Sequence, residues 1–248
     1  MEQPGTTKRL RLHYDAKYAG ADWRTVKPIP VLKYPTLRTE NLVAIAARVK
    51  RGSYLEIGAG DGATILSLLD YFDRLVGTEL SPIRARQMQL LFAENPKVEI
   101  LVNNIEQDGL PFPNATFDTV AIVAVIEHTI EPIGVMREIY RVLKPGGRAI
   151  VDTPNIAKWT RRLKLVAGYF PSTASLQEGL IHYDLKTPTD LHDEGHLHYF
   201  TFRSFGRIAC ERVGFERVEL CGYGKTLLHR LWPEMFSELC VLLHKRAS

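Results

Sequence analysis

A glycine-rich stretch that contains the acid Glu56, YLEIGAGDGATI at residues 54–65, has the composition of a nucleotide-binding turn. Gly58, Gly60 and Ala63 fit the G-x-G-x-x-G/A pattern of dinucleotide-binding turns, in which glycines let backbone N–H groups approach a ligand closely. The same stretch also fits acid-x-G-x-G-x-G, with Glu56 as the acid and Gly62 as the last glycine. The glycines alone therefore leave two classes of adenosine cofactor open.

Glu56 separates these two interpretations. A carboxylate at this position would repel the pyrophosphate of a nicotinamide or flavin dinucleotide, because like charges repel. It would attract a ligand with a positively charged amino-acid group and a sulfonium. Glu79, which ends the next β-rich run, can accept both hydroxyls of a ribose with either cofactor. The pair of carboxylates therefore predicts S-adenosylmethionine (SAM) as the cofactor.

Histidines in the second half of the chain could supply a general base. Methyl transfer to a hydroxyl or amine needs a base with a pKa near neutrality, which favours histidine. The candidates are His128, His182 and, in the run HDEGHLHYF (192–200), His192, His196 and His198, of which His196 or His198 is the favoured base. His128 could equally hold its loop in shape, and the 192–200 run could be a polar strap. We expect no metal in this run, because Gly195 interrupts the helix that would align its ligands.

The composition is that of a globular protein with 248 residues, 45% hydrophobic and 24% charged, and a formal net charge of +4. Such a chain is expected to form one domain, or one domain with an insertion. The mild charge and the short basic runs, 8–11 and 158–164, predict no nucleic-acid partner. Cys210, Cys221 and Cys240 are too few and too dispersed for a disulfide framework. With no run of about 20 apolar residues, we expect a cytoplasmic protein without a membrane span, in an oligomeric state left open.

Short β-rich runs alternate with helical patterns through the first 154 residues. Strands are expected at 53–57, 74–80, 97–102, 117–126 and 148–154, with two more at 217–223 and 239–245. Helices are expected at 36–50, 63–72, from Ser81 onward, at 131–143 and at 202–213. This alternation predicts an α/β fold with a doubly wound, mostly parallel sheet.

The change of pattern after Pro154 divides the chain into four parts. Residues 1–35 are polar and proline-rich, and their Tyr14, Tyr18 and Trp23 could fold over the cofactor or pack on the sheet edge. Residues 36–154 form the expected SAM-binding core. Residues 155–200 are expected to be a substrate lid inserted after strand five, and residues 201–248 to complete the sheet.

Four segments together resemble the class I SAM-dependent methyltransferases, within the broad group that includes ubiquinone-biosynthesis, sugar and natural-product enzymes. The segments are YLEIGAGDGATI, LVGTELSP, NNIEQDGLPFPNATFDTVAIVAVIEH and MREIYRVLKPGGRAIVDTPN, in the expected order between about residues 53 and 155. A later stretch, HLHYFTFRSFGRIACERVGFERVEL, is similar to the carboxyl-terminal helix and strand of that group. The resemblance implies a Rossmann-like, seven-stranded sheet whose last strand is antiparallel.

The resemblance also implies roles for individual residues. The methionine part of SAM would be surrounded by Glu56, Gly58, Gly60 and Asp61. The adenosine part and the cofactor wall would involve Glu79, Leu80, Asn104, Ile105 and Ala124. Asn104 stands where the family usually has an aspartate, and its carbonyl can still accept a hydrogen bond.

The implied reaction is transfer of a methyl group to an oxygen or nitrogen of a small-molecule acceptor by in-line displacement, with S-adenosylhomocysteine as product. Two other functions remain open: an NAD-dependent oxidoreductase and a non-catalytic SAM-binding protein. Arg161, Arg162 and Lys164, beside Trp159, could grip an anionic substrate or could be solvated helix charges.

Overall fold

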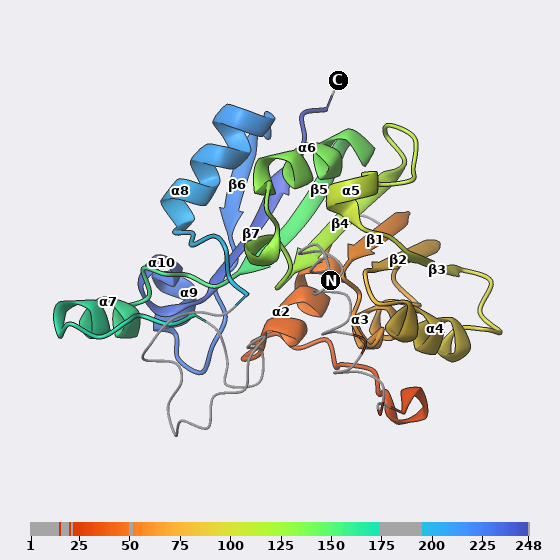
Figure 1. Ribbon diagram of the computed structural model, residues 1–248, viewed down its shortest axis with the longest axis horizontal. Coiled ribbons are helices and arrows are strands. Elements are labelled where there is room, and N and C mark those ends of the chain that lie inside the picture. The colour runs from red at the N-terminus through yellow and green to blue at the C-terminus, as the bar shows by residue number, and fades with distance from the viewer. Residues whose placement is uncertain (1–14, 16–19, 21, 50–51, 174–194, 248) are drawn as a thin grey trace, which may run out of the picture.

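The computed structural model describes residues 15, 20, 22–49, 52–173 and 195–247 and contains a seven-stranded sheet in the order β3-β2-β1-β4-β5-β7-β6 (Figure 1). Strands β1 to β5 are parallel to one another, whereas β7 is antiparallel to both β5 and β6. The predicted mostly parallel sheet with an antiparallel last strand is confirmed. Among the described residues, no helix has the length and apolar character needed to cross a bilayer.

The strands agree with the expected runs to within a few residues at most ends. Their bounds are β1 Ser53–Ile57, β2 Arg74–Glu79, β3 Val98–Val102, β4 Phe117–Val123, β5 Leu143–Thr153, β6 Arg217–Leu220 and β7 Leu239–His244. Strand β5 begins five residues earlier than Arg148, because it continues through the KPGG turn beyond an irregularity in its pairing with β4. The central strands are buried on both faces, as their continuous apolar runs predict.

Helices cover both faces of the sheet, each over its own hydrophobic core (Figure 1). On one face lie α2 (Arg38–Ala46), α3 (Ala63–Ser67) and α4 (Pro82–Leu91), and on the other lie α5 (Ile105–Asp108), α6 (Pro132–Val142) and α8 (Phe202–Arg207), which continues into the π-helical turn η4 (Ile208–Val213). Alternate residues of β1 serve the two cores: Tyr54 packs with α2 and α3, whereas Leu55 packs with α6. This alternation is the two-residue period of a strand.

The remaining helical elements are short and lie outside the two main layers. They are η1 (Trp23–Thr25), η2 (Ile126–His128), α7 (Trp159–Val166), α9 (Leu228–Leu231) and α10 (Pro233–Phe236). Because β1 to β4 are parallel and in register, their carboxyl ends meet at one edge of the sheet, where open α/β sheets bind ligands.

Candidate cofactor and acceptor site

The glycine turn after β1 has a backbone that only glycine adopts readily. Gly58, Gly60 and Gly62 have φ angles of 71°, 59° and 80°, in the left-handed region that other residues rarely enter. A Cβ on Gly58 would lie 2.4 Å from Cγ2 of Val125, whereas a Cβ on Gly60 would meet nothing within 4 Å. The turn thus packs against the end of β4 on one side and leaves space beside Gly60 for a ligand.

Glu79 at the end of β2 holds this turn in place. Its Oε2 accepts a hydrogen bond from the Gly60 N–H at 3.1 Å, and its Oε1 accepts one from the Ser81 N–H at 3.1 Å. Burial raises the pKa of Glu79, and the backbone N–H donors oppose that rise. A carboxylate has about four lone-pair sites, so Glu79 can still accept hydrogen bonds from two ribose hydroxyls.

Glu56 is buried at the end of β1, and its carboxylate accepts hydrogen bonds from the hydroxyl groups of Thr64 and Tyr54. The Thr64 hydroxyl lies 2.6 Å from Oε1 and 2.5 Å from Oε2, and the Tyr54 hydroxyl donates to Oε2 at 3.2 Å. Burial raises the pKa of Glu56 to about 7, although both hydroxyl donors oppose this shift. A cation beside Glu56 would favour its ionised form, which fits the amino group and sulfonium of SAM.

Two asparagines after β3 carry buried polar atoms that have no hydrogen-bond partner among the described residues. These atoms are Oδ1 of Asn103 and Nδ2 of Asn104. The other amide atoms are engaged: Asn103 Nδ2 donates to Gly109 O at 3.0 Å, and Asn104 Oδ1 accepts from Glu106 N at 3.2 Å as the cap of α5. One acceptor and one donor therefore remain, and adenine offers both an amino donor and ring-nitrogen acceptors. The residues present fit the adenosine part of SAM.

The carbonyl of Asn104, which the sequence suggested as the adenine acceptor, is thus already occupied by the helix cap. Its amide is the group available instead. Of the other expected cofactor residues, Leu80 is half-buried, Ile105 is buried in the core, and Asp61 is exposed with its Oδ1 accepting from Ala63 N at 3.0 Å. Ala124, at the end of β4, has a left-handed φ of 53°.

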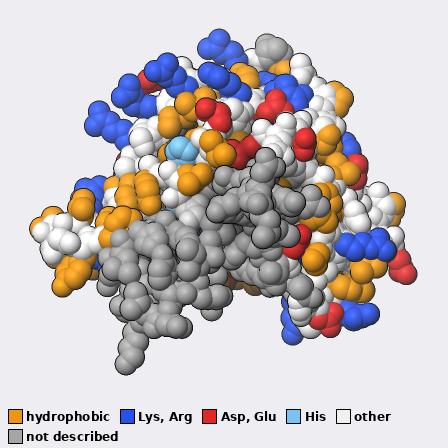
Figure 2. All heavy atoms as spheres, in the orientation of Figure 1, with side chains coloured by type: hydrophobic (Ala, Val, Ile, Leu, Met, Phe, Trp, Pro, Cys, Tyr) orange, Lys and Arg blue, Asp and Glu red, His pale blue; other side chains and the backbone are white. Residues whose placement is uncertain are grey.

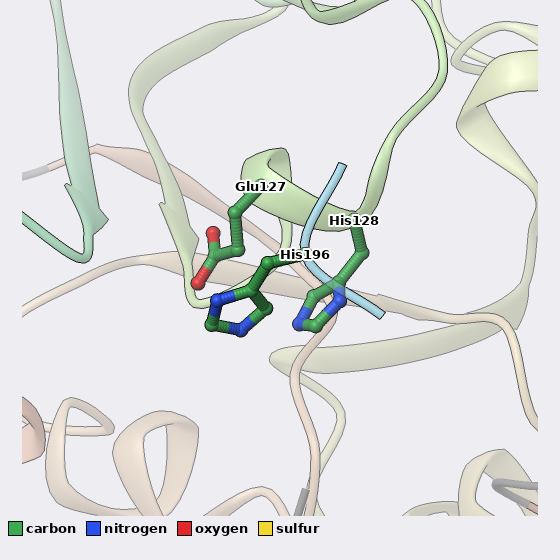
Figure 3. A group of neighbouring side chains, drawn as sticks. All are labelled: Glu127, His128 and His196. Atoms are coloured by element: carbon green, nitrogen blue, oxygen red, sulfur yellow. The ribbon is translucent and has the colours of Figure 1, made fainter. Parts of the chain in front are cut away.

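Glu127, His128 and His196 form a compact group beyond the end of β4 (Figure 3). One ligand-type atom from each of the three lies within 4.8 Å of the others. The two imidazole rings have centroids 4.7 Å apart and planes 68° apart, and Nδ1 of His128 lies 2.7 Å from the Gly195 carbonyl oxygen. A carbonyl on Nδ1 fixes the tautomer that leaves Nε2 as the basic nitrogen.

Hydrogen bonds from distant segments hold this group together. The backbone N–H groups of Leu197 and His198 donate to the Glu127 carbonyl oxygen at 2.8 and 3.2 Å. The Thr153 hydroxyl donates to Glu127 Oε2 at 3.0 Å, and Nδ1 of His196 lies 2.7 Å from the Thr173 hydroxyl. The group can therefore act as an acid–base relay, and its two imidazoles and one carboxylate are also a ligand set that zinc uses.

His198 lies outside this group. Its Nε2 contacts the Ile130 carbonyl oxygen at 3.2 Å, and its ring stacks on Phe200 with centroids 6.1 Å apart. The structure thus brings together His128 and His196, which were separate candidates in the sequence, and leaves His198 outside the group. Tyr14, Tyr18, His182 and His192 lie outside the described residues.

A buried ion pair between Arg38 and Asp152 was not predicted from the sequence. Arg38 Nε lies 2.7 Å from Oδ1 of Asp152, which is 2% exposed at its side chain. Burial raises the pKa of Asp152 to about 7, and Arg38 opposes the rise. The hydrophobic surroundings of Asp152 in β5 gave no sign of this partner, because Arg38 comes from a helix more than 100 residues earlier.

Arg161 is held by a second ion pair, with Glu238. Its Nη1 lies 2.6 Å from Glu238 Oε2 and 2.8 Å from the Asn155 carbonyl oxygen, and Lys158 Nζ lies 3.0 Å from Glu238 Oε1. The two cations lower the pKa of Glu238 to about 2 despite its burial. Arg161 therefore connects the start of α7 to the segment before β7, and its side chain stabilises the fold.

Comparison with known proteins agrees with this site. Residues 55–151 match the family model described as "Methyltransferase domain". A Mycolicibacterium smegmatis protein named "Probable S-adenosylmethionine-dependent methyltransferase" is 32% identical over 111 residues, which cover 45% of this chain and 41% of that protein. A sterol 4-C-methyltransferase of Caenorhabditis elegans is 32% identical over 100 residues, 39% of this chain and 29% of that protein. The chain spans less than half the length of these curated relatives.

Among solved structures, the [4+2]-cyclase SpnF is similar with a TM-score of 0.64 and 15% identity, and the alignment covers 98% of each chain. At that identity the likeness concerns the fold alone, and a cyclase with this fold shows that the fold also carries other chemistry. The sequence matches resolve the ambiguity of the glycine turn, because the matched family uses SAM as methyl donor. The chain therefore carries a domain of the class I SAM-dependent methyltransferases, as its motifs predict.

Proposed function

We propose that this protein transfers a methyl group from SAM to an oxygen or nitrogen of a small-molecule acceptor. One observation carries the proposal: the histidine group begins just after Val125, a residue beyond the end of β4 that packs on the cofactor turn. Val125, which packs on Gly58, is followed directly by Ile126, Glu127 and His128. A proton acceptor thus follows, within three residues, a side chain that contacts the cofactor turn.

The chain's own residues divide the work between the two sides of the site. Glu79 and the two asparagines would hold the adenosine part, and Glu56 would hold the positively charged methionine part. When bound, SAM supplies a methyl group already activated by its sulfonium, so the protein contributes mainly alignment and a base. His128, oriented by the Gly195 carbonyl and next to His196, takes the acceptor's proton.

The same observation favours an oxygen or nitrogen acceptor over a non-acidic carbon. A hydroxyl or amine must lose a proton during methylation, and the Glu127–His128–His196 group provides a place for it. The sterol relative supports an apolar molecule as acceptor, although that relative's name specifies a carbon atom.

We also propose that residues 1–35 cover the cofactor side and that residues 155–200 form the acceptor lid. The Ser81 hydroxyl, beside Glu79, donates a hydrogen bond to the carboxylate of Asp15, and Ile29 N donates to Ser67 Oγ at 2.6 Å. Both contacts bring the first segment to α3 and α4. His196 contributes to the acceptor side from the end of the second segment.

Two measurements on the purified chain test the function. Calorimetry with SAM and S-adenosylhomocysteine should show binding at sub-millimolar concentration, and NADH should give no fluorescence change. Transfer of a radiolabelled methyl group should then be followed across hydroxyl-, amine- and sterol-type acceptors. Absence of SAM binding would overturn the proposal, and binding without transfer to any acceptor would favour a non-catalytic SAM-binding protein.

A further inference from the structure

Two short helices expose large apolar side chains at one end of the molecule. No residue of α7 is buried, and the side chains of Val166 and Leu163 are 87% and 58% exposed. In α9, Leu231 is 71% exposed. Figure 2 shows hydrophobic side chains on the left edge, where Figure 1 places α7. We call this surface the apolar rim and define it by Trp159, Leu163, Val166, Leu227, Leu231 and Trp232.

Hydrogen bonds and ion pairs connect the start of α7 to the segment that contains α10. The Asn155 side-chain amide, four residues before α7, donates to the carbonyl oxygens of Glu234 and Ser237 at 2.9 and 3.1 Å. Glu238 adds ion pairs to Lys158 and Arg161. Because α10 follows α9 directly, these contacts fix α7 beside the α9–α10 segment and keep both apolar helices at the same end.

Basic side chains outnumber acidic ones around the apolar rim, where Glu238 pairs with Lys158 and Arg161. Residues 155–173 contain two lysines and two arginines and no acidic residue. Lys225 precedes α9 and Arg230 lies within it, and Glu234 is the acid in the first turn of the following helix. A basic helix with exposed Trp, Leu and Val side chains has the composition of an interfacial membrane-binding helix.

We propose that the apolar rim docks the protein on the surface of an anionic lipid bilayer. Leucine, valine and tryptophan side chains would enter the boundary of the acyl chains, and the basic residues would contact acidic headgroups. Large apolar side chains that are exposed together on a surface mark an interaction site. A second copy of the chain would bring the same positive charges against this surface, which disfavours self-association. A projecting helix also suits a fluid surface, because a bilayer needs no matching groove.

Flotation of the full chain with phospholipid vesicles tests this proposal. At 0.15 M salt, the protein should float with vesicles of phosphatidylcholine and phosphatidylglycerol and bind pure phosphatidylcholine at least fivefold less. The fluorescence of Trp159 and Trp232 should shift to shorter wavelength on binding. The double variant Leu163→Glu and Val166→Glu should bind the anionic vesicles at least tenfold less.

A matched control uses apolar residues that are exposed elsewhere. Ile83 and Leu90 on α4 are 39% and 40% exposed, on a different part of the molecule. Changing both to glutamate should leave vesicle binding within twofold of the unchanged chain. All variants should retain SAM binding, which shows that they are folded and separates this proposal from the methyltransferase function.

Three outcomes would overturn the proposal. The first is absence of flotation with anionic vesicles, and the second is equal loss of binding in the α4 control. The third is that the unchanged chain binds no vesicles but forms a concentration-dependent dimer in gel filtration, and that the Leu163→Glu and Val166→Glu variant abolishes this dimer. This last result would assign the apolar rim to contact between copies. Arg162→Gln, which removes one positive charge, should weaken binding to anionic vesicles about fivefold, because each basic residue near such a surface contributes about 1 kcal/mol.

Discussion

The cofactor side and the acceptor side of the site are built in opposite ways. On the cofactor side, the carboxylates and amides bond to groups that are close in the sequence, the longest such contact being that of Glu79 with Gly60, 19 residues earlier. On the acceptor side, the functional group joins Glu127 and His128 to His196, which is nearly 70 residues later in the chain. The first side depends on local turns, and the second depends on the docking of a distant segment.

The two sides of the site should therefore respond differently to substitutions. A local turn keeps its shape as long as its own strands are paired, whereas the histidine group exists only while the 195–198 backbone remains bonded to Glu127. Substitutions on the cofactor side should therefore change affinity for SAM. Substitutions on the acceptor side should change turnover or stability and leave the cofactor bound.

The largest expected effect is on turnover, at the histidine group. His128→Ala and His196→Ala should each lower kcat by about 10²- to 10⁴-fold, the usual contribution of a general base, with SAM affinity unchanged in calorimetry. His198→Ala should change kcat less than threefold, because His198 lies outside the group. A chelator should have no effect. Loss of activity with a chelator and recovery with zinc would instead identify the group as a metal site.

The second effect is on stability, at the buried ion pair that supports the acceptor side. Arg38→Met leaves the Asp152 carboxylate unpaired in the core, which should lower the free energy of unfolding by about 3–5 kcal/mol. Urea denaturation measures this loss. Asp152→Asn in the same chain should restore much of it.

A surface ion pair provides the matched control for this experiment. Arg74 and Glu99 form a pair whose side chains are each nearly half exposed. Arg74→Met should therefore change the free energy of unfolding by less than about 1 kcal/mol. Equal losses in the Arg38 and Arg74 variants would refute the buried pair's role.

The third effect is on cofactor affinity. Glu79→Ala removes the acceptor for the ribose and also the group that holds the Gly60 N–H, so SAM should bind more than tenfold more weakly. Hydrogen bonds to a charged group contribute about 1.5–3 kcal/mol. Glu99→Ala on the exposed part of the neighbouring β3 is the control and should bind normally. An unchanged affinity in Glu79→Ala would remove Glu79 from the ribose role.

The smallest effect is a pH dependence that belongs to the cofactor side alone. With a pKa of about 7, Glu56 is mostly protonated at pH 6 and mostly ionised at pH 8. Only the ionised form attracts a cation, so affinity for SAM should rise about tenfold across this range. Glu56→Gln should bind SAM weakly and without this pH dependence. Calorimetry at several pH values would contradict the assignment if both proteins gave the same slope.

Local patterns in the sequence predicted most of the fold and the cofactor side. Glu56, the glycines and Glu79 lie within 24 residues, and their geometry follows from strand-end turns that the sequence itself marks. The alternation of strands and helices was sufficient for the sheet, because parallel strands with short connections allow few arrangements.

Contacts between distant residues could not be predicted in the same way. His128 and His196 were both candidates, but nothing in their own neighbourhoods showed that the 195–198 strand-like segment pairs with the Glu127 carbonyl. Arg38 and Asp152 carried no signal, since each looks like an ordinary helix or strand residue until the fold brings them to 2.7 Å. The short helices α9 and α10 were also missed, because single turns have little periodicity.

The hydrogen bond from Gly60 to Glu79 has a consequence for the energetics of recognition. The carboxylate that would accept the ribose hydroxyls also fixes the backbone of the turn, through a hydrogen bond that needs no group outside the protein. The turn therefore loses little conformational freedom when a ligand enters, and preorganisation of this kind increases affinity without any added contact. The Gly60 amide should consequently exchange its hydrogen slowly in the ligand-free protein, and cofactor should slow that exchange only modestly.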